Sequence, residues 1–216
     1  MLVLYGHPLS SFCMKVTTAL YEAGTDFRYE RVDLGDPASR DRLLALWPLG
    51  KMPVLRDEGR GETVPETSAI LEYLSLHHPG AARLTPASPD EVWRARLAER
   101  VFDLHVQVPM QKIVGDRLRP EGSHDPAGVE EARAALVRAL DWAEGEMRRR
   151  TWALGEAFTI ADCAAAPALY YADKVQPFAA THAAAWAYLE RLRARPSFAR
   201  TLTEAEPYSH MFPAEA

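Results

Sequence analysis

The sequence predicts a two-domain chain, in which an α/β domain with the element order βαβαββα precedes an all-α helical bundle. Short β-rich runs alternate with helical periodicity over residues 1–78, and a polar, proline-containing stretch at residues 79–88 indicates a linker. Over residues 89–216 the apolar residues repeat only with helical spacing. The 216 residues are enough for two domains that each bury their own core.

The α/β domain is expected to begin with a βαβ unit and to end with two short strands and a helix. The expected strands are Leu2 to Gly6, Phe27 to Leu34, Met52 to Arg56 and Glu62 to Val64. The expected helices are Ser11 to Ala23, Pro37 to Leu46 and Glu66 to His77. Pro53 lies near the start of a strand, where its missing N–H is tolerated, and the Met52–Pro53 bond is a candidate for the cis form.

The second domain is expected to contain four long helices. They are Asp90 to Arg117, Pro126 to Arg150, Thr159 to Ala172 and Thr181 to Ala194. Pro109 is expected to kink the first of them. Thr159 and Asp162 have the spacing of a capping box with Asp in place of Glu, so we expect them to serve folding rather than catalysis.

Composition excludes several classes of function. The 25 basic and 30 acidic residues give a net charge of −5, which argues against binding to nucleic acid. Only Cys13 and Cys163 are present, so we expect neither a disulfide framework nor a CxxC metal site, and a reducing cytoplasm fits. The sequence has no run of about 18 apolar residues, so we expect no membrane segment.

The junction between the first strand and the first helix is the strongest candidate for chemistry. Ser10 and Ser11 lie at the start of that helix, where unpaired N–H groups and the helix dipole favour an anion such as a thiolate. The competing interpretation is that the two serines only cap the helix, because serine is among the preferred capping residues. Position alone does not decide between these roles.

Four short motifs, in order along the chain, carry a family resemblance. They are Gly-His-Pro-Leu-Ser-Ser at residues 6–11, Leu-Gly-Lys-Met-Pro-Val-Leu at 49–55, Glu-Thr-Ser-Ala-Ile-Leu-Glu-Tyr-Leu at 66–74 and Phe-Thr-Ile-Ala-Asp at 158–162. Together they resemble the cytosolic glutathione transferases, as a serine-type bacterial member. The resemblance implies a thioredoxin-like first domain, glutathione as co-substrate, no metal, and a homodimer with the third and fourth helices at its interface.

The resemblance implies that the Ser10 hydroxyl binds the glutathione sulfur, and elementary energetics support this role. Lowering a thiol pKa of about 8.5 by about two units needs roughly 2.7 kcal/mol. An O–H donor to a charged acceptor contributes about 1.5–3 kcal/mol and a helix N-terminus about 0.3–1 kcal/mol. Ser11 flanks the same turn and remains the alternative. Cys13 follows at CxxC spacing without the first cysteine, so we expect it to pack in the core rather than exchange disulfides.

The rest of the implied glutathione site lies at the start of the third strand and of the third helix. Backbone groups of Met52, beside Pro53, would pair with the extended peptide. Glu66 and Thr67 would hold the γ-glutamyl end, although both also fit an ordinary helix start. Ser11 and Lys51 are further candidates for contacts with glutathione, while the contact for the glycine carboxylate stays open.

The electrophile is expected to bind between the domains. Candidate lining residues are Leu9, His105, Val106, Met110 and Ile113. An apolar stripe is more often core, and a lone histidine on such a face is more often packed or solvent-facing. Tyr208, Met211 and Phe212 near the end of the chain could cover this pocket or dock on the bundle.

These patterns favour a detoxifying glutathione transferase that attacks a small hydrophobic electrophile. The first alternative is a glutathione-dependent isomerase or dehalogenase that uses the same site. The resembling zeta-class isomerases share the Ser-Ser pair but carry a cysteine where Phe12 stands here. The second alternative is a non-catalytic interaction module of the same fold, against which the joint presence of Ser10, Pro53, Glu66 and Thr67 argues.

Overall fold

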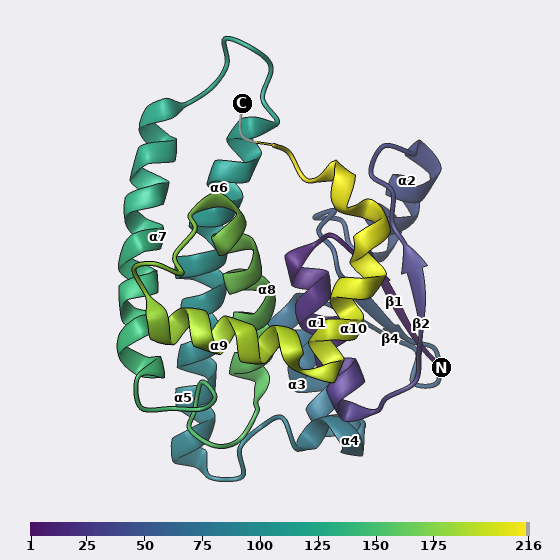
Figure 1. Cartoon of the computed structure of the whole chain (residues 1–216). Coiled ribbons are helices and arrows are strands. Elements are labelled where there is room, and N and C mark those ends of the chain that lie inside the picture. Colours follow the sequence, from purple (N-terminus) through teal and green to yellow (C-terminus); the bar gives the residue numbers. More distant parts are fainter. Residues whose placement is uncertain (215–216) are drawn as a thin grey trace.

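The computed structural model describes residues 1–214, apart from the side chain of Ala82, and confirms the order βαβαββα in the first domain (Figure 1). The strands are β1 (Leu2–Gly6), β2 (Phe27–Arg31), β3 (Val54–Asp57) and β4 (Glu62–Pro65). The helices are α1 (Ser11–Ala23), α2 (Pro37–Leu46) and α3 (Thr67–His77). Strand β2 ends earlier than predicted, at Arg31, and exposed residues such as Leu34 follow it.

The four strands form one mixed sheet in the order β2-β1-β3-β4. Strand β1 is parallel to β2 and antiparallel to β3, which is antiparallel to β4. Because side chains alternate across a sheet, Leu4 and Leu55 face α1 and α3, whereas Val54 packs with Leu43 of α2 on the other face. The sheet is therefore covered by helices on both sides.

The second domain is helical, as predicted, but its elements are more broken than the periodicity indicated. They are α5 (Pro89–Val101), the π-helical segment η1 (Phe102–Gln107), α6 (Val108–Arg117), α7 (Pro126–Met147), α8 (Ile160–Val175), α9 (Ala183–Ala194), α10 (Pro196–Ala205) and the 3₁₀ segment η2 (Glu206–Met211). The stretch predicted as a linker begins with a short helix, α4 (Pro79–Ala82), which packs against α3 and α1 of the first domain. The predicted single helix from Asp90 to Arg117 thus passes through a π-helical turn, just before Pro109. Helix α10 and segment η2 were not predicted.

Helix α1 is the element shared by the two domains. Ten of its thirteen residues are buried, because it packs against α3 on one side and against α8 and α10 of the helical domain on the other. Figure 1 shows α1 in the middle of the molecule, and α10, drawn in yellow near the end of the chain, lies beside it. The Arg195 guanidinium at the start of α10 binds Glu22 of α1 through two hydrogen bonds, of 3.0 and 2.6 Å.

A buried ion pair joins α1 to the helical domain. The Lys15 side chain is 1% exposed, and its Nζ donates to Glu99 Oε1 and to Asp103 Oδ2, both at 2.7 Å. Burial raises the pKa of Asp103, while the Lys15 ammonium opposes that rise. Ser68 of α3 also donates to Glu99 Oε1, at 2.7 Å. Both carboxylates that pair with Lys15 therefore belong to the second domain.

The capping box at the start of α8 is confirmed. Asp162 is buried, and its carboxylate accepts hydrogen bonds from Thr159 N and Ala153 N, each at 2.8 Å, and from Tyr188 Oη at 2.6 Å. Thr159 Oγ1 accepts in turn from Ala161 N. Because buried carboxylates are costly unless hydrogen-bonded, these donors explain how Asp162 is accommodated in the core.

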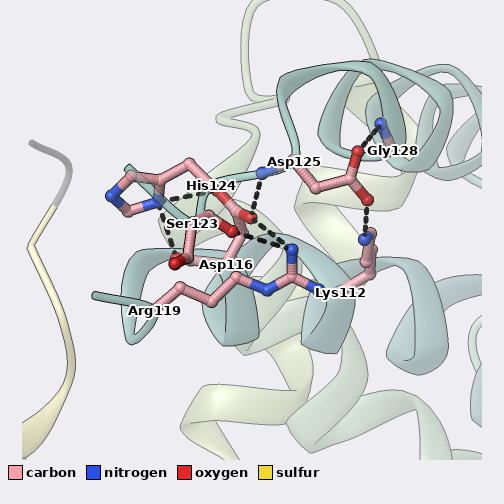
Figure 2. Close-up of polar contacts among 7 residues, drawn as sticks. All are labelled: Lys112, Asp116, Arg119, Ser123, His124, Asp125 and Gly128. Atoms are coloured by element: carbon pink, nitrogen blue, oxygen red, sulfur yellow. Dashed lines mark hydrogen bonds and ion pairs between the residues drawn. The ribbon is translucent and has the colours of Figure 1, made fainter. Parts of the chain in front are cut away.

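A surface network closes the connection between α6 and α7 (Figure 2). Asp125 caps α7 by accepting from Gly128 N at 2.9 Å, and it also pairs with Lys112. Asp116 accepts from Asp125 N at 2.8 Å and contacts His124 Nδ1 at 3.2 Å. These donors lower the pKa of both carboxyl groups. The network thus satisfies the ends of two helices at the tip of the helical domain.

The buried ion pair makes Lys15 a test of the domain contact. We expect Lys15→Met to destabilise the protein by about 3–5 kcal/mol, because it leaves Glu99 and Asp103 buried without their cation. Urea unfolding followed by circular dichroism measures the change. The control is Lys51→Met, which removes an exposed lysine and is expected to change stability by less than about 0.5 kcal/mol. Equal stabilities of the two variants would contradict this account.

Candidate active site

Three predicted segments meet at one edge of the sheet. In the strand register, Tyr5 at the end of β1 pairs with Val54, which pairs in turn with Pro65 at the end of β4. The turn to Ser10 follows the end of β1, Met52 and Pro53 precede β3, and Glu66 and Thr67 follow β4. The topology therefore brings the three motifs of the first domain to the same edge.

The two serines of the first motif have different environments. Ser10 is partly exposed and is the N-cap of α1, where its Oγ accepts from Cys13 N at 3.4 Å. Ser11 is only 6% exposed and its Oγ accepts from Gln107 Nε2 of the helical domain. A hydroxyl that accepts one hydrogen bond can still donate its proton. Ser10 is thus partly exposed and its O–H can still donate, whereas Ser11 is buried against the second domain.

The turn that carries Ser10 is held by its own residues and by α8. Ser10 N donates to His7 O at 2.9 Å, and Leu9 N donates to His7 Nδ1 at 3.2 Å. Tyr171 Oη of α8 donates to Leu9 O at 2.7 Å. Because Nδ1 must be unprotonated to accept, the His7 ring is neutral in this arrangement. Burial, and then the charge of Arg31, lower the pKa of His7 and favour that neutral form.

The Met52–Pro53 peptide bond, which the sequence marked as a candidate for the cis form, is cis. Lys51 is exposed, Met52 is partly buried, and Pro53 is buried at the start of the strand. Glu66, at the start of α3, has φ 66° and ψ 121°, an unusual backbone conformation for a residue other than glycine. Such strain costs roughly 1–3 kcal/mol and is often found at functional sites. Glu66 is exposed and Thr67 is 8% exposed, directly at the helix N-terminus.

Both cysteines are buried, which confirms the prediction for Cys13. Cys13 is buried, and burial raises the pKa of its thiol to about 11, although Ser10 and backbone hydrogen bonds act in the opposite direction. Burial likewise raises the pKa of Cys163. A nucleophilic cysteine requires its thiolate form, which neither environment favours.

The predicted pocket residues fall into three environments. Val106, Met110 and Ile113 belong to the hydrophobic core of the helical domain, which is the more common role of an apolar stripe. His105 is exposed on η1. Leu9 is partly buried and packs against the core of the helical domain. Of these five residues, only Leu9 lies in the turn that carries Ser10.

The C-terminal segment docks on the same turn. The rings of Tyr208 and His7 meet edge to face, with centroids 4.9 Å apart, and Phe212 stacks on Tyr171 at 5.5 Å. Met211 is exposed. A separate cavity of about 200 Å³ lies between α1, β2 and α10 and has Pro8 and Tyr208 in its walls. The end of the chain therefore borders the residues that precede Ser10.

Sequence reasoning missed the residues that hold this turn from outside. Tyr171 and Gln107 lie far along the chain from Ser10, and no motif marks them. His7 belongs to the first motif, but the motif does not indicate that its ring accepts a hydrogen bond from Leu9 N. Within residues 1–214, no group of three or more His, Cys, Asp or Glu side chains is arranged to hold a metal ion. None of the helices in that range has the length and apolar character needed to cross a membrane.

The fold and this edge define a two-domain protein with a mixed sheet followed by a helical bundle, and comparisons with known proteins give its family. Family profiles match at residues 4–82 (Glutathione S-transferase, N-terminal domain) and 126–210 (Glutathione S-transferase, C-terminal domain). Glutathione S-transferase 3 of Zea mays is 34% identical over 93% of each chain. The chain belongs to the glutathione S-transferase family of enzymes.

Solved structures agree with this assignment. A glutathione S-transferase of Methylobacillus flagellatus, solved with glutathione bound, has a TM-score of 0.85 and 26% identity, covering 93% of this chain and 98% of its own. One from Methylobacterium radiotolerans, in complex with glutathione sulfonate, has a TM-score of 0.81 and 30% identity, with 93% of both chains covered.

Two relatives carry other names. A probable maleylacetoacetate isomerase of Caenorhabditis elegans is 29% identical, over 80% of this chain and 79% of its own length. A stringent starvation protein A homolog of Coxiella burnetii is 27% identical, over 95% and 93%. The first of these names is that of an isomerase, which is the reaction class of the first alternative.

The hydrogen bond from Leu9 to His7 predicts how His7 titrates. We expect the His7 ring to titrate below 6.5, because its environment disfavours the charged form. Its contribution to the free energy of unfolding is then full above pH 6.5 and is lost as the pH falls below that value. NMR titration of the ring measures the pKa.

Two neighbouring charges provide matched controls of opposite sign. Arg31→Gln is expected to raise the pKa of His7, since the Arg31 charge lowers it, and Asp33→Asn is expected to lower that pKa further. A ring that titrates above 6.5, or two substitutions that shift its pKa in the same direction, would contradict the assignment.

Proposed function

We propose that this chain is a serine-type glutathione transferase, in which the Ser10 hydroxyl stabilises the thiolate of glutathione for attack on a small hydrophobic electrophile. The observation that carries the proposal is the difference between the two serines. Ser10 is partly exposed at the N-terminus of α1, whereas Ser11 is buried and hydrogen-bonded to Gln107. Glutathione and glutathione sulfonate are bound in the solved relatives, which supports the choice of co-substrate.

The proposed reaction requires the protein mainly to orient glutathione and the electrophile and to stabilise the charge of the thiolate. The thiol loses its proton to solvent, and the resulting thiolate accepts the O–H of Ser10 in the positive field of the helix N-terminus. The thiolate then forms the new S–C bond at an electrophilic carbon, and either a leaving group departs with its electron pair or, at an activated double bond, the displaced π electrons take up a proton from solvent. Holding both reactants in one cleft supplies the remaining rate enhancement through proximity.

The other residues at the sheet edge suit an extended peptide. Backbone groups of Met52 would pair with glutathione as an added strand, with Lys51 exposed beside them. The N–H groups at the start of α3 and the Thr67 hydroxyl would bind the γ-glutamyl carboxylate, and Glu66 would accept from its amine. Ser11 would contribute to the site through its hydrogen bond with Gln107 rather than by direct contact with glutathione.

We propose that the electrophile binds beside Leu9, between that turn and the helical domain. His105 remains a candidate at the solvent side. Val106, Met110 and Ile113 would form the core that supports this side of the pocket, since all three are buried. Tyr208 and Phe212, which dock on the turn and on Tyr171, are in position to border the same space.

A glutathione-dependent isomerase is the second candidate, because one relative is named as a probable maleylacetoacetate isomerase. The same thiolate would add to the substrate and leave again, so that glutathione is regenerated. Phe12 stands where the resembling isomerases have cysteine, which favours the transferase. Product analysis separates the two activities, since only the transferase consumes glutathione.

The role of Ser10 is tested by titrating bound glutathione. We expect the thiol to ionise about two units below its solution pKa of about 8.5 in the unsubstituted protein, and Ser10→Ala to remove most of that shift. Ultraviolet difference absorbance of the thiolate measures it. Ser88→Ala is the control, because Ser88 is also a helix N-cap but makes no capping hydrogen bond. Binding with an unshifted thiol pKa, or a shift that survives Ser10→Ala, would overturn the assignment.

We further propose that the protein is a cytoplasmic homodimer. Four apolar residues, between 45% and 54% exposed, follow one face of α5, η1 and α6: Trp93, Leu97, Leu104 and Val108. Large exposed apolar patches are unusual on monomers. A second copy is the expected partner, because the resemblance implies a homodimer with the third and fourth predicted helices at its interface, and these residues lie on the fourth. The two free, buried cysteines suit a reducing compartment.

The dimer is tested by placing charge on this face. We expect the unsubstituted protein to sediment at twice its chain mass of 24.1 kDa, and Leu97→Glu to weaken the dimer by at least tenfold, because a buried carboxylate without a partner is costly. Analytical ultracentrifugation measures the masses. The control is Leu118→Glu, at an exposed leucine at the end of α6. A monomeric unsubstituted protein would contradict the proposal.

A further inference from the structure

Two hydrogen bonds from the helical domain end on the two neighbours of Ser10. Tyr171 Oη, on α8, donates to Leu9 O at 2.7 Å, and Gln107 Nε2, on η1, donates to Ser11 Oγ. Both donors come from the second domain, and both acceptors belong to the turn that enters α1. The residue proposed to bind the thiolate is thus tethered on each side.

The tether at Leu9 is specific to the hydroxyl of Tyr171. Its ring packs edge to face on Tyr170, with centroids 5.1 Å apart, and stacks on Phe212, so the ring would stay in place without the hydroxyl. Burial raises the pKa of Tyr171, so the hydroxyl stays protonated and donates throughout the working pH range. Leu9 also donates its N–H to His7 Nδ1, so both backbone groups of Leu9 are occupied.

The hydrogen bond to Ser11 gives a reason for the buried side-chain amide of Gln107. Gln107 is 2% exposed, and its Oε1 has no hydrogen-bond partner among the described residues. A buried amide with one unpaired atom is costly, and its one hydrogen bond ends on the residue after Ser10. Asp103, four residues earlier on the same π-helical segment, contacts Lys15 of α1. Segment η1 therefore contacts α1 through two polar side chains.

We propose that Tyr171 and Gln107 are positioning residues for thiol activation, which hold the residues on both sides of Ser10, through the Leu9 carbonyl and the Ser11 hydroxyl, so that the Ser10 hydroxyl keeps a constant position. The inference rests on the proposed role of Ser10. A hydrogen bond to a thiolate weakens quickly as its geometry loosens, so a turn free to move would leave the thiol with a higher pKa. Neither side chain needs to touch glutathione for this effect.

The test measures the thiol pKa of bound glutathione in Tyr171→Phe. We expect that pKa to rise by about 0.5–1 unit, which at saturating glutathione and a pH below the thiol pKa lowers kcat about three- to tenfold. The loss should disappear at a pH well above the pKa, and KM for glutathione should change by less than about twofold. A purely structural defect would not recover with pH.

Two tyrosines of this chain provide matched controls. Tyr170→Phe alters the neighbouring ring, which packs on Tyr171 but has no role in the tether. Tyr73→Phe removes a hydroxyl that donates to Asp57 Oδ2 at 2.8 Å, at the other end of β3, and so deletes a comparable hydrogen bond far from Ser10. Both are expected to leave the thiol pKa unchanged.

The tether at Ser11 is tested separately with Gln107→Met, which has a similar volume and removes the donor. We expect a shift of the thiol pKa in the same direction as for Tyr171→Phe, and this variant decides the question if Tyr171→Phe fails to fold. Thermal unfolding of each variant confirms that it is folded. In the double variant the thiol pKa should approach its value in Ser10→Ala.

The outcomes separate this inference from the proposed function. A lowered thiol pKa that is lost in Ser10→Ala but unchanged in folded Tyr171→Phe and Gln107→Met would overturn the positioning role alone. Both proposals would be overturned if the thiol pKa is not lowered in the unsubstituted protein, or if it is lowered equally in Ser10→Ala. A rise in either tether variant, with none in the tyrosine controls, supports the inference.

Discussion

The buried charge of Lys15 is the constraint on which the arrangement of the two domains depends. An ammonium group out of water is costly, and here its partners are two carboxylates of the helical domain. Desolvation of such a group can cancel the Coulombic gain, so the net stabilisation is small. If α1 packed on the helical domain in a position that moved Lys15 away from Glu99 and Asp103, both ion pairs would be lost. The ion pair therefore selects one arrangement of the domains, while apolar packing supplies most of the stability.

The position of α1 determines the geometry of the site. Lys15 lies one helical turn, about 6 Å, beyond Ser11, so what holds the ammonium also holds the first turn of the helix. The strand register then determines where the Met52–Pro53 and Glu66–Thr67 segments lie, because Tyr5, Val54 and Pro65 are paired across three strands. The site is thus built from an edge of the sheet and one helix end, and the helical domain fixes that end.

Much of this could be predicted from the sequence, because periodicity and capping are local. The order of the first domain and the capping box at Asp162 were predicted and are confirmed, and the Met52–Pro53 bond, which the sequence marked as a candidate, is cis. Helix α10 was missed because Pro196 follows two residues after the end of α9, and a proline there fits the end of one helix as well as the first turn of the next. The choice between Ser10 and Ser11 depends on Gln107, 96 residues away, which no local pattern indicates.

The environment of Cys13 shows which physical effect matters at the helix N-terminus. Its thiol lies in the first turn of α1, close to the positive end of the dipole and to the Ser10 hydroxyl, yet its pKa rises to about 11. A helix terminus contributes only about 0.3–1 kcal/mol, which burial outweighs. A thiol at this helix therefore ionises only where solvent and a donated O–H can reach it. Ser10, unlike buried Ser11, is partly exposed, and a co-substrate bound beside it would meet both conditions while Cys13 stays protonated.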